Sequence, residues 1–216
     1  CHYCLVDAGM GGAADGEVAN QKLADTAKAP FNGHDGRSEE NTISRMLTTF
    51  KRANHRIREY AGRNPHDKGM GCTAELLAFS EKRFFIGHVG DSRTYRLRNN
   101  NTLKQLTKDH SLVQEKLDQG LISPQEARRH AMRNVILKAV GVSDTITPDL
   151  LRGSKNPGDL FLLCSDGLTD MVEDSTVLAT LAGEGALPEK SQALIQLAKA
   201  AGGRDNVTVV LSTVLG

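Results

Sequence analysis

The sequence has few cysteines and no regular spacing among them. Its 216 residues include only four, which are Cys1, Cys4, Cys72 and Cys164. Scattered cysteines in a chain of this length do not make a disulfide framework, so we expect reduced thiols. Cys1 and Cys4 have the spacing of zinc ligands, but no second pair follows them, and we therefore do not predict a zinc site.

The sequence also lacks a charge imbalance and a long apolar run. Its 27 basic residues are nearly balanced by 26 acidic residues, which gives a formal net charge of +1. No global field therefore selects nucleic acid or an anionic membrane as a partner. No apolar run approaches the roughly 18 residues that suggest a membrane span, and no signal-peptide pattern opens the chain. We expect a cytoplasmic monomer that binds neither nucleic acid nor membrane.

No linker, internal repeat or low-complexity tract divides the chain. This uniformity predicts one domain over residues 1–216, and an apolar fraction of 39% is ordinary for a globular core. The chain opens at Cys1 directly in strand-like sequence, without an initiator methionine. We therefore expect that an N-terminal segment is missing.

A clear helical pattern lies over residues 38–61. Apolar side chains recur there at steps of three and four residues, which is typical of a helix that faces a core. Ser38 suits the N-terminus of this helix, and Ser123 with Pro124 suits the start of another. The sequence predicts further helices over residues 16–29, ended near Pro30, and over 111–139, 175–182 and 191–201.

Short apolar runs separated by turn residues predict strands. Residues 72–98 have the pattern of an antiparallel hairpin, and Asn99–Asn101 predicts a second turn because asparagine tolerates the left-handed backbone. Further strands are predicted over residues 102–106, 159–164 and 206–214. Strands and long helices occur in blocks, which favours the α+β class over a doubly wound parallel sheet. Two antiparallel sheets with helices packed outside fit this pattern.

Four strand-like runs carry an aspartate at one end, beside or near glycine. Asp7, Asp91 and Asp166 end three of these runs, and Asp205 opens the last. Converging carboxylates repel one another unless protons or cations neutralise them, and the acids come without a histidine cluster, which favours magnesium or manganese over zinc. Two such ions about 4 Å apart can activate a water for attack on a phosphoryl group. Each aspartate alone is a common turn residue, so only the four together specifically indicate a metal site.

Six short motifs follow one another along nearly the whole chain. They are Gly9-Met10-Gly11-Gly12, Gly69-Met70-Gly71-Cys72-Thr73, Gly90-Asp91-Ser92-Arg93, Leu106-Thr107-Lys108-Asp109-His110-Ser111, Ser165-Asp166-Gly167-Leu168 and Gly203-Arg204-Asp205-Asn206. In this order they resemble the metal-dependent serine/threonine protein phosphatases of the type 2C class, in their compact bacterial form. Any one motif would be weak, and the set is highly specific.

The resemblance implies a fold, a site and an activity. The fold is a four-layer sandwich of two antiparallel sheets with helices on both outer faces, and residues 109–140 correspond to a mobile flap beside the active site. Asp166 and Asp205 match side-chain ligands of the catalytic metal pair, and Gly9 matches a backbone carbonyl ligand. Asp91 matches the ligand of a third ion. The implied reaction is hydrolysis of phosphoserine and phosphothreonine on proteins by a metal-activated water, with two or three Mn²⁺ or Mg²⁺ ions.

Two departures from the family's pattern leave an alternative open. The family's bridging metal ligand is an aspartate directly before the glycine, and here Ala8 stands in that place with Asp7 one residue earlier. Because side chains alternate along a strand, Asp7 would point to the opposite face unless a bulge or bend redirects it. The family's earlier strand pair, which bears a phosphate-binding arginine, does not precede Cys1, and Met10 replaces a histidine proposed as general acid in animal relatives. We keep Asp7 in the predicted ligand set; the alternative is a phosphatase-like domain that binds a phosphoprotein or regulatory partner without turnover.

Three further side chains each have two interpretations. His88 lies in an apolar strand, which favours a core or hairpin position over catalysis. His110 could cap the first helix of the flap or approach the substrate, and we favour the cap. Arg93 could bind a phosphate or pair with a nearby carboxylate.

Overall fold

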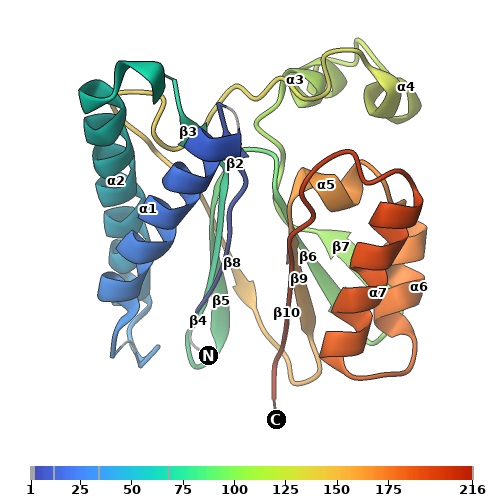
Figure 1. Ribbon diagram of the computed structural model, residues 1–216. Coiled ribbons are helices and arrows are strands. Elements are labelled where there is room, and N and C mark those ends of the chain that lie inside the picture. Colours follow the sequence, from blue (N-terminus) through green and yellow to red (C-terminus); the bar gives the residue numbers. More distant parts are fainter. Residues whose placement is uncertain (1–2, 12, 34, 68, 216) are drawn as a thin grey trace.

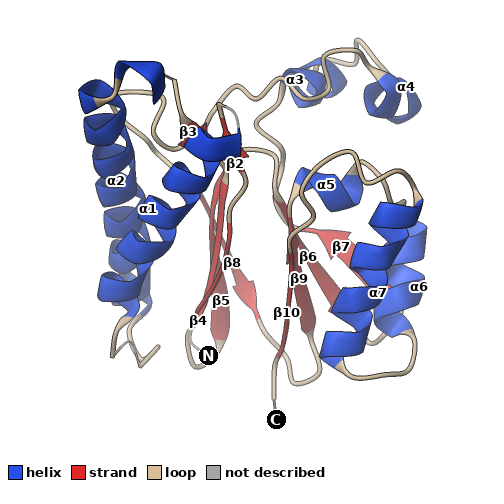
Figure 2. Ribbon diagram, in the orientation of Figure 1, coloured by secondary structure: helices blue, strands red, loops and turns tan. Residues whose placement is uncertain are grey.

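Two antiparallel four-stranded sheets lie face to face, with helices on both outer sides (Figures 1 and 2). The structure is a computed structural model that describes residues 3–11, 13–33, 35–67 and 69–215. The first sheet has the order β1 (Tyr3–Val6), β4 (Ala74–Phe79), β5 (Arg83–Val89) and β8 (Asp149–Ser154). The second has the order β10 (Val209–Thr213), β9 (Leu160–Cys164), β6 (Arg93–Arg98) and β7 (Thr102–Gln105). The predicted α+β sandwich is confirmed.

The outer layers are made of two helix pairs. Helices α1 (Ala13–Phe31) and α2 (Glu39–Arg63) lie on the first sheet, and α6 (Asp174–Ala182) and α7 (Leu187–Ala200) lie on the second (Figure 1). At one end of the sandwich are the two-stranded ladder of β2 (Gly9–Met10) and β3 (Gly71–Cys72), the one-turn helix α5 (Asp166–Thr169), α3 (Leu112–Asp118) and α4 (Pro124–Arg129). A 3-10 turn, η1 (Pro65–Asp67), follows α2.

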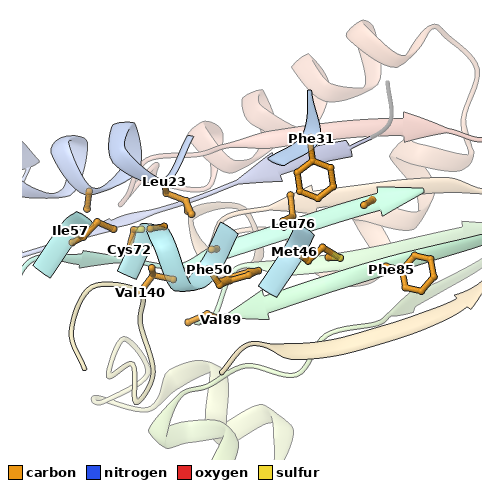
Figure 3. Packing of buried hydrophobic residues seen from close by; sticks show 14 of the residues in the cluster. Leu23, Phe31, Met46, Phe50, Ile57, Cys72, Leu76, Phe85, Val89 and Val140 are labelled. Atoms are coloured by element: carbon orange, nitrogen blue, oxygen red, sulfur yellow. The ribbon is translucent and has the colours of Figure 1, made fainter. Parts of the chain in front are cut away.

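Three apolar clusters fill the spaces between the layers. Under α1 and α2 the cluster includes Leu23, Phe50 and Leu76 (Figure 3). Between the sheets lie, among others, Leu77 and Phe161. A third cluster packs β6 and β9 against α6 and α7. Because both faces of the central strands are covered, these strands have continuous apolar runs instead of a polar–apolar alternation.

The first turn of α2 shows how a local signal sets a helix boundary. The Ser38 hydroxyl accepts a hydrogen bond from the Asn41 N–H at 3.1 Å, as an N-cap residue does. The helix then buries Met46, Phe50 and Ile57 on one side, against the first sheet. The predicted helix and its cap are confirmed.

The flap segment differs from its prediction. Residues 111–139 were predicted to be helical, with a helix start at Ser123, but only α3 and α4 are helical and residues 130–139 are irregular. Gly120 adopts a φ of +68° just after α3, which ends that helix. The Ser123 and Glu126 side chains form a reciprocal capping box that starts α4, with Pro124 in its first turn.

The edge strand β8 was not predicted. Four of its six residues are exposed, and its apolar side chains are limited to Leu150 and Leu151. The strand is stabilised by pairing with β5, for example Leu151 opposite Ile86, and this long-range pairing has no signal in the local sequence. In the described part of the chain, no helix is both long and apolar enough to cross a membrane.

Candidate metal centre

The predicted site residues line one cavity of about 340 Å³ at the end of the sandwich nearest β2 and α5. Asp91 follows β5, Asp166 follows β9 as the first residue of α5, and Asp205 precedes β10. Asp7 and Gly9 also border this cavity. Strand ends that lie 39 or more residues apart in the sequence are thus brought to one place, as the strand-end pattern predicted.

Asp91 is the most deeply buried acid of the group. It is 7% exposed, and its Oδ1 atom has no hydrogen-bond partner among the described residues. Burial, followed by the negative charges of Asp166 and Asp109, raises the pKa of Asp91 to about 8. The preceding Gly90 has a φ of +109°, and a Cβ there would lie 2.5 Å from the Thr73 side chain. Only glycine fits at this turn, which brings Asp91 into the cavity.

Asp166 and Asp205 are held side by side by a close contact between two loops. A Cβ on Gly167 would lie 2.3 Å from the Asn206 carbonyl oxygen, so the glycine allows the loops to touch. Asp166 Oδ1 accepts a hydrogen bond from the Gly167 N–H at 2.9 Å, and Asp205 Oδ1 accepts one from the Asn206 N–H at 2.7 Å. Burial, then the charge of Asp205, raises the pKa of Asp166 to about 6.

The backbone register fixes the side of the strand on which Asp7 lies. Val6 pairs with Glu75 and Gly9 pairs with Cys72, so the register between the two chain segments continues without an inserted residue. The bulge that would redirect Asp7 is therefore absent from this described stretch. Val6 belongs to the cluster between the sheets, and alternation places Asp7 on the opposite, helix-facing side.

The surroundings of Asp7 agree with this orientation. Burial raises its pKa to about 6, and the Asp7 carboxylate in turn helps burial to raise the pKa of Cys72, which belongs to the cluster under α1 and α2. Asp7 Oδ2 is buried and has no hydrogen-bond partner among the described residues. Ala8 contributes to the cavity wall at the position between Asp7 and Gly9. Whether Asp7 binds a metal stays a prediction.

The donor set fits a hard cation that keeps part of its water shell. No three His, Cys, Asp or Glu side chains in the described part of the chain lie close enough to hold a metal ion alone. Mg²⁺ is usually bound by one or two carboxylates while it retains several waters, so this set of carboxylates is compatible with it. Asp91 Oδ1 has no hydrogen-bond partner among the described residues, and the pKa values of Asp91 and Asp166 are raised. Carboxylates that bind a cation have these features when only protein groups surround them.

In the metal-free protein we expect the stability that Asp91 contributes to fall as the pH rises. The pKa of Asp91 is about 8 in the folded state against an ordinary 3.8, so the folded protein holds a proton that the unfolded chain loses. This contribution is complete below about pH 4 and is lost as the pH passes through about 8, at about 1.4 kcal/mol per pKa unit. Melting curves in EDTA test this: wild type should lose stability relative to Asp91→Asn between about pH 5 and about pH 8. Parallel curves for the two proteins would contradict the burial of this acid.

Arg93 and the two histidines have structural partners. Arg93 makes a two-pronged ion pair with Asp109, at 2.9 Å from Nε to Oδ1 and 2.7 Å from NH2 to Oδ2, so the carboxylate pairing is the one observed. His88 is fully buried, as the core interpretation predicted. The prediction that His110 caps a helix is wrong, because Ser111 is the N-cap of α3 and accepts from the Gln114 N–H at 3.2 Å.

Asn20, Asn134 and Ile136 border the cavity but were not predicted from the sequence to do so. Asn20 comes from α1, and its buried Oδ1 lacks a hydrogen-bond partner in the described structure. Asn134 and Ile136 come from the flap segment. Neither a motif nor a periodic pattern marks these residues, because only the tertiary fold brings them to the strand ends.

Comparisons with known proteins agree with this geometry. Residues 2–116 match the family described as Protein phosphatase 2C. The chain belongs to this family. It is 38% identical over 210 residues to the serine/threonine protein phosphatase PstP of Mycobacterium tuberculosis, matching 96% of this chain and 39% of that protein. It is 36% identical over 208 residues to the serine/threonine phosphatase stp of Listeria welshimeri, matching 96% of this chain and 82% of that protein.

The fold is also that of a family member with known metal content. The crystal structure of the PstP catalytic domain in complex with two manganese ions superposes with a TM-score of 0.90 at 34% identity. The match covers 100% of this chain and 88% of that one. The resemblance to metal-dependent serine/threonine phosphatases is thereby confirmed. The chain spans about two fifths of the length of PstP itself.

Proposed function

We propose that this protein hydrolyses phosphoserine and phosphothreonine on other proteins at a centre of two or three Mn²⁺ or Mg²⁺ ions. The observation that carries the proposal is the single cavity lined by Asp91, Asp166, Asp205 and Gly9. Relatives with the names of serine/threonine phosphatases support the reaction class. We also propose that residues 1–216 act as one cytoplasmic, monomeric phosphatase domain whose flap spans residues 109–140.

Each ligand has a defined part in this proposal. Asp166, Asp205 and the Gly9 carbonyl would hold the catalytic pair, and Asp91 would hold an accessory ion. Such ions, when bound, polarise the phosphoryl group and lower the pKa of the attacking water. The N–H groups of Gly167 and Asn206 orient the two catalytic carboxylates through the hydrogen bonds described above.

The basic side chains near the site already have acidic partners. Arg93, Arg128 and Arg133 border an adjoining cavity beneath the flap, but each guanidinium is paired with an acid, which is Asp109, Glu173 and Asp170 respectively. We therefore propose that the phosphoryl group is bound chiefly through the ions, with Asn134 of the flap on the shared wall of both cavities.

The proposal predicts hydrolysis of a phosphothreonine peptide that depends on added metal. Purified protein should release phosphate in the presence of Mn²⁺, and EDTA should abolish this release because the water would lose its activating ions. Phosphate release is measured with and without chelator, and excess Mn²⁺ should restore it. Activity that persists unchanged in EDTA would contradict the mechanism.

A second candidate is a phosphatase-like domain that binds a phosphoprotein without efficient turnover. Ala8 at the position of the family's bridging ligand favours it, together with the helix-facing side of Asp7. The discriminating variant is Ala8→Asp, which adds a carboxylate on the cavity wall.

If the bridging position limits activity, Ala8→Asp should raise Mn²⁺ affinity and the rate by about tenfold or more, the scale on which ligand-sphere changes act. The matched control is Ala8→Asn, which adds similar volume without charge. Calorimetry and phosphate release on both variants separate the two candidates. An unchanged rate in Ala8→Asp alongside efficient wild-type turnover would remove the second candidate.

A further inference from the structure

His110 forms hydrogen bonds with both the N–H and the carbonyl group of Gly90, the residue before Asp91. The Gly90 N–H donates to His110 Nδ1 at 3.0 Å, and the His110 N–H donates to the Gly90 carbonyl oxygen at 2.7 Å. Because Gly90 is the flexible position from which Asp91 enters the cavity, these two bonds restrict where the Asp91 carboxylate can lie.

The other side of the His110 ring reaches β8. Since Nδ1 accepts a hydrogen bond, the ring is neutral and carries its proton on Nε2. Nε2 lies 3.2 Å from Asp149 Oδ2 and donates to it. Asp149 Oδ1 accepts from Lys138 Nζ at 2.9 Å, so one carboxylate joins His110 to the far end of the flap.

A buried ion pair supports the ring from below. The rings of His88 and His110 stack with centroids 4.5 Å apart. His88 Nε2 donates to the Lys108 carbonyl oxygen at 2.8 Å, and Nδ1 contacts Glu75 Oε1. Glu75 Oε2 accepts from Thr94 Oγ1 at 2.8 Å. Every polar atom of this support is engaged, so the platform under His110 is rigid.

The flap returns to the same point. The Leu137 N–H donates to the His110 carbonyl oxygen at 2.8 Å, and Ser111 forms a bridge with Ile136. Ile136, which takes part in this contact, and Asn134, two residues before it, both line the cavity. His110 lies at the entry of the flap and is bonded to the flap's exit at Leu137, to β8 and to the Asp91 turn.

We propose that His110 is a positioning residue that fixes the Asp91 carboxylate and the root of the flap against the core. This inference rests on the proposed function, because it assigns His110 a role toward an ion held by Asp91. His110 itself need not touch substrate or metal. Its effect is transmitted through Gly90 on one side and Leu137 on the other.

The test compares two substitutions of similar size in the full chain. His110→Asn keeps an acceptor close to the place of Nδ1, whereas His110→Leu removes it. Mn²⁺ titration by calorimetry should show that His110→Leu weakens, by about 10- to 100-fold, the same binding event that Asp91→Asn removes. His110→Asn should recover most of that affinity. His55→Ala, on the exposed face of α2, is the control and should bind like wild type.

Amide exchange gives a readout that does not depend on metal or activity. In the metal-free wild type, the Gly90 and Leu137 amides should both be protected, and His110→Leu should release the Gly90 amide while His110→Asn retains it. Equal Mn²⁺ binding by the leucine and asparagine variants would overturn the inference. If His110→Leu does not fold, an unprotected Gly90 amide in the wild type would overturn it as well. Wild-type Mn²⁺ binding without phosphopeptide hydrolysis would refute the proposed function alone.

Discussion

Replacing Asp166 by asparagine is expected to lower the rate of phosphopeptide hydrolysis by at least about 100-fold, since the loss of an outer partner of a metal ligand alone costs 10–100-fold. Asp166 interacts with both neighbouring acids. Burial and then Asp205 raise the pKa of Asp166, and burial and then Asp166 raise the pKa of Asp91. Asparagine keeps the shape of the side chain but removes the charge that a divalent ion requires. Steady-state phosphate release with saturating Mn²⁺ measures the effect.

The Asp166 prediction has a matched control in Asp25→Asn. Asp25 is an exposed acid of α1 that pairs with Lys28, and its removal should leave the rate unchanged. Thermal stability should also distinguish a loss of activity from a loss of folding. Asp166→Asn should melt at or above the melting temperature of the metal-free wild type, because burial disfavours the charged carboxylate that the substitution removes. An Asp166→Asn protein that folds, binds Mn²⁺ and turns over like wild type would contradict its assigned role.

Replacing Glu75 by leucine is expected to destabilise the fold by about 3–5 kcal/mol, the range for removing one partner of a buried ion pair. Glu75 and His88 are both fully buried, and the imidazole would keep its contact with Lys108 while losing its counter-charge. Although burial alone would lower it, the Glu75 carboxylate raises the pKa of His88. Urea unfolding of the metal-free protein measures the free energy.

The double variant Glu75→Leu/His88→Leu separates the charge from the packing. It should be closer to wild type in stability than Glu75→Leu, because it leaves no unpaired charge in the core. A single substitution that costs less than the double one would show that the pair contributes as packing volume and not as an ion pair.

The parts of the fold that could be predicted from the sequence are those with strong local signals. Helix α2 has its cap at Ser38 and its apolar stripe in the same stretch of chain. The turn after β6 was predicted from asparagines, and Asn99 and Asn100 have φ values of +53° and +54°. Strand β8 could not be predicted because it is an exposed edge whose stability comes from pairing with β5. The end of the flap is likewise held by long-range contacts rather than by its own sequence.

The same division holds in the site. Strand-end position was enough to bring Asp91, Asp166 and Asp205 to one cavity. The role of His110 could not be predicted in this way, because the partners of its ring, Gly90 and Asp149, lie 20 and 39 residues away in the chain. A capping role was the only local use available for that residue, and Ser111 already fills it.

The central claim is that the strand-end aspartates form a divalent metal centre, and Mn²⁺ anomalous diffraction from crystals of the whole chain tests it most directly. Anomalous peaks are expected in the cavity bounded by Gly9, Asp91, Asp166 and Asp205. Crystals that are saturated with Mn²⁺ and show no peak in that cavity would contradict it.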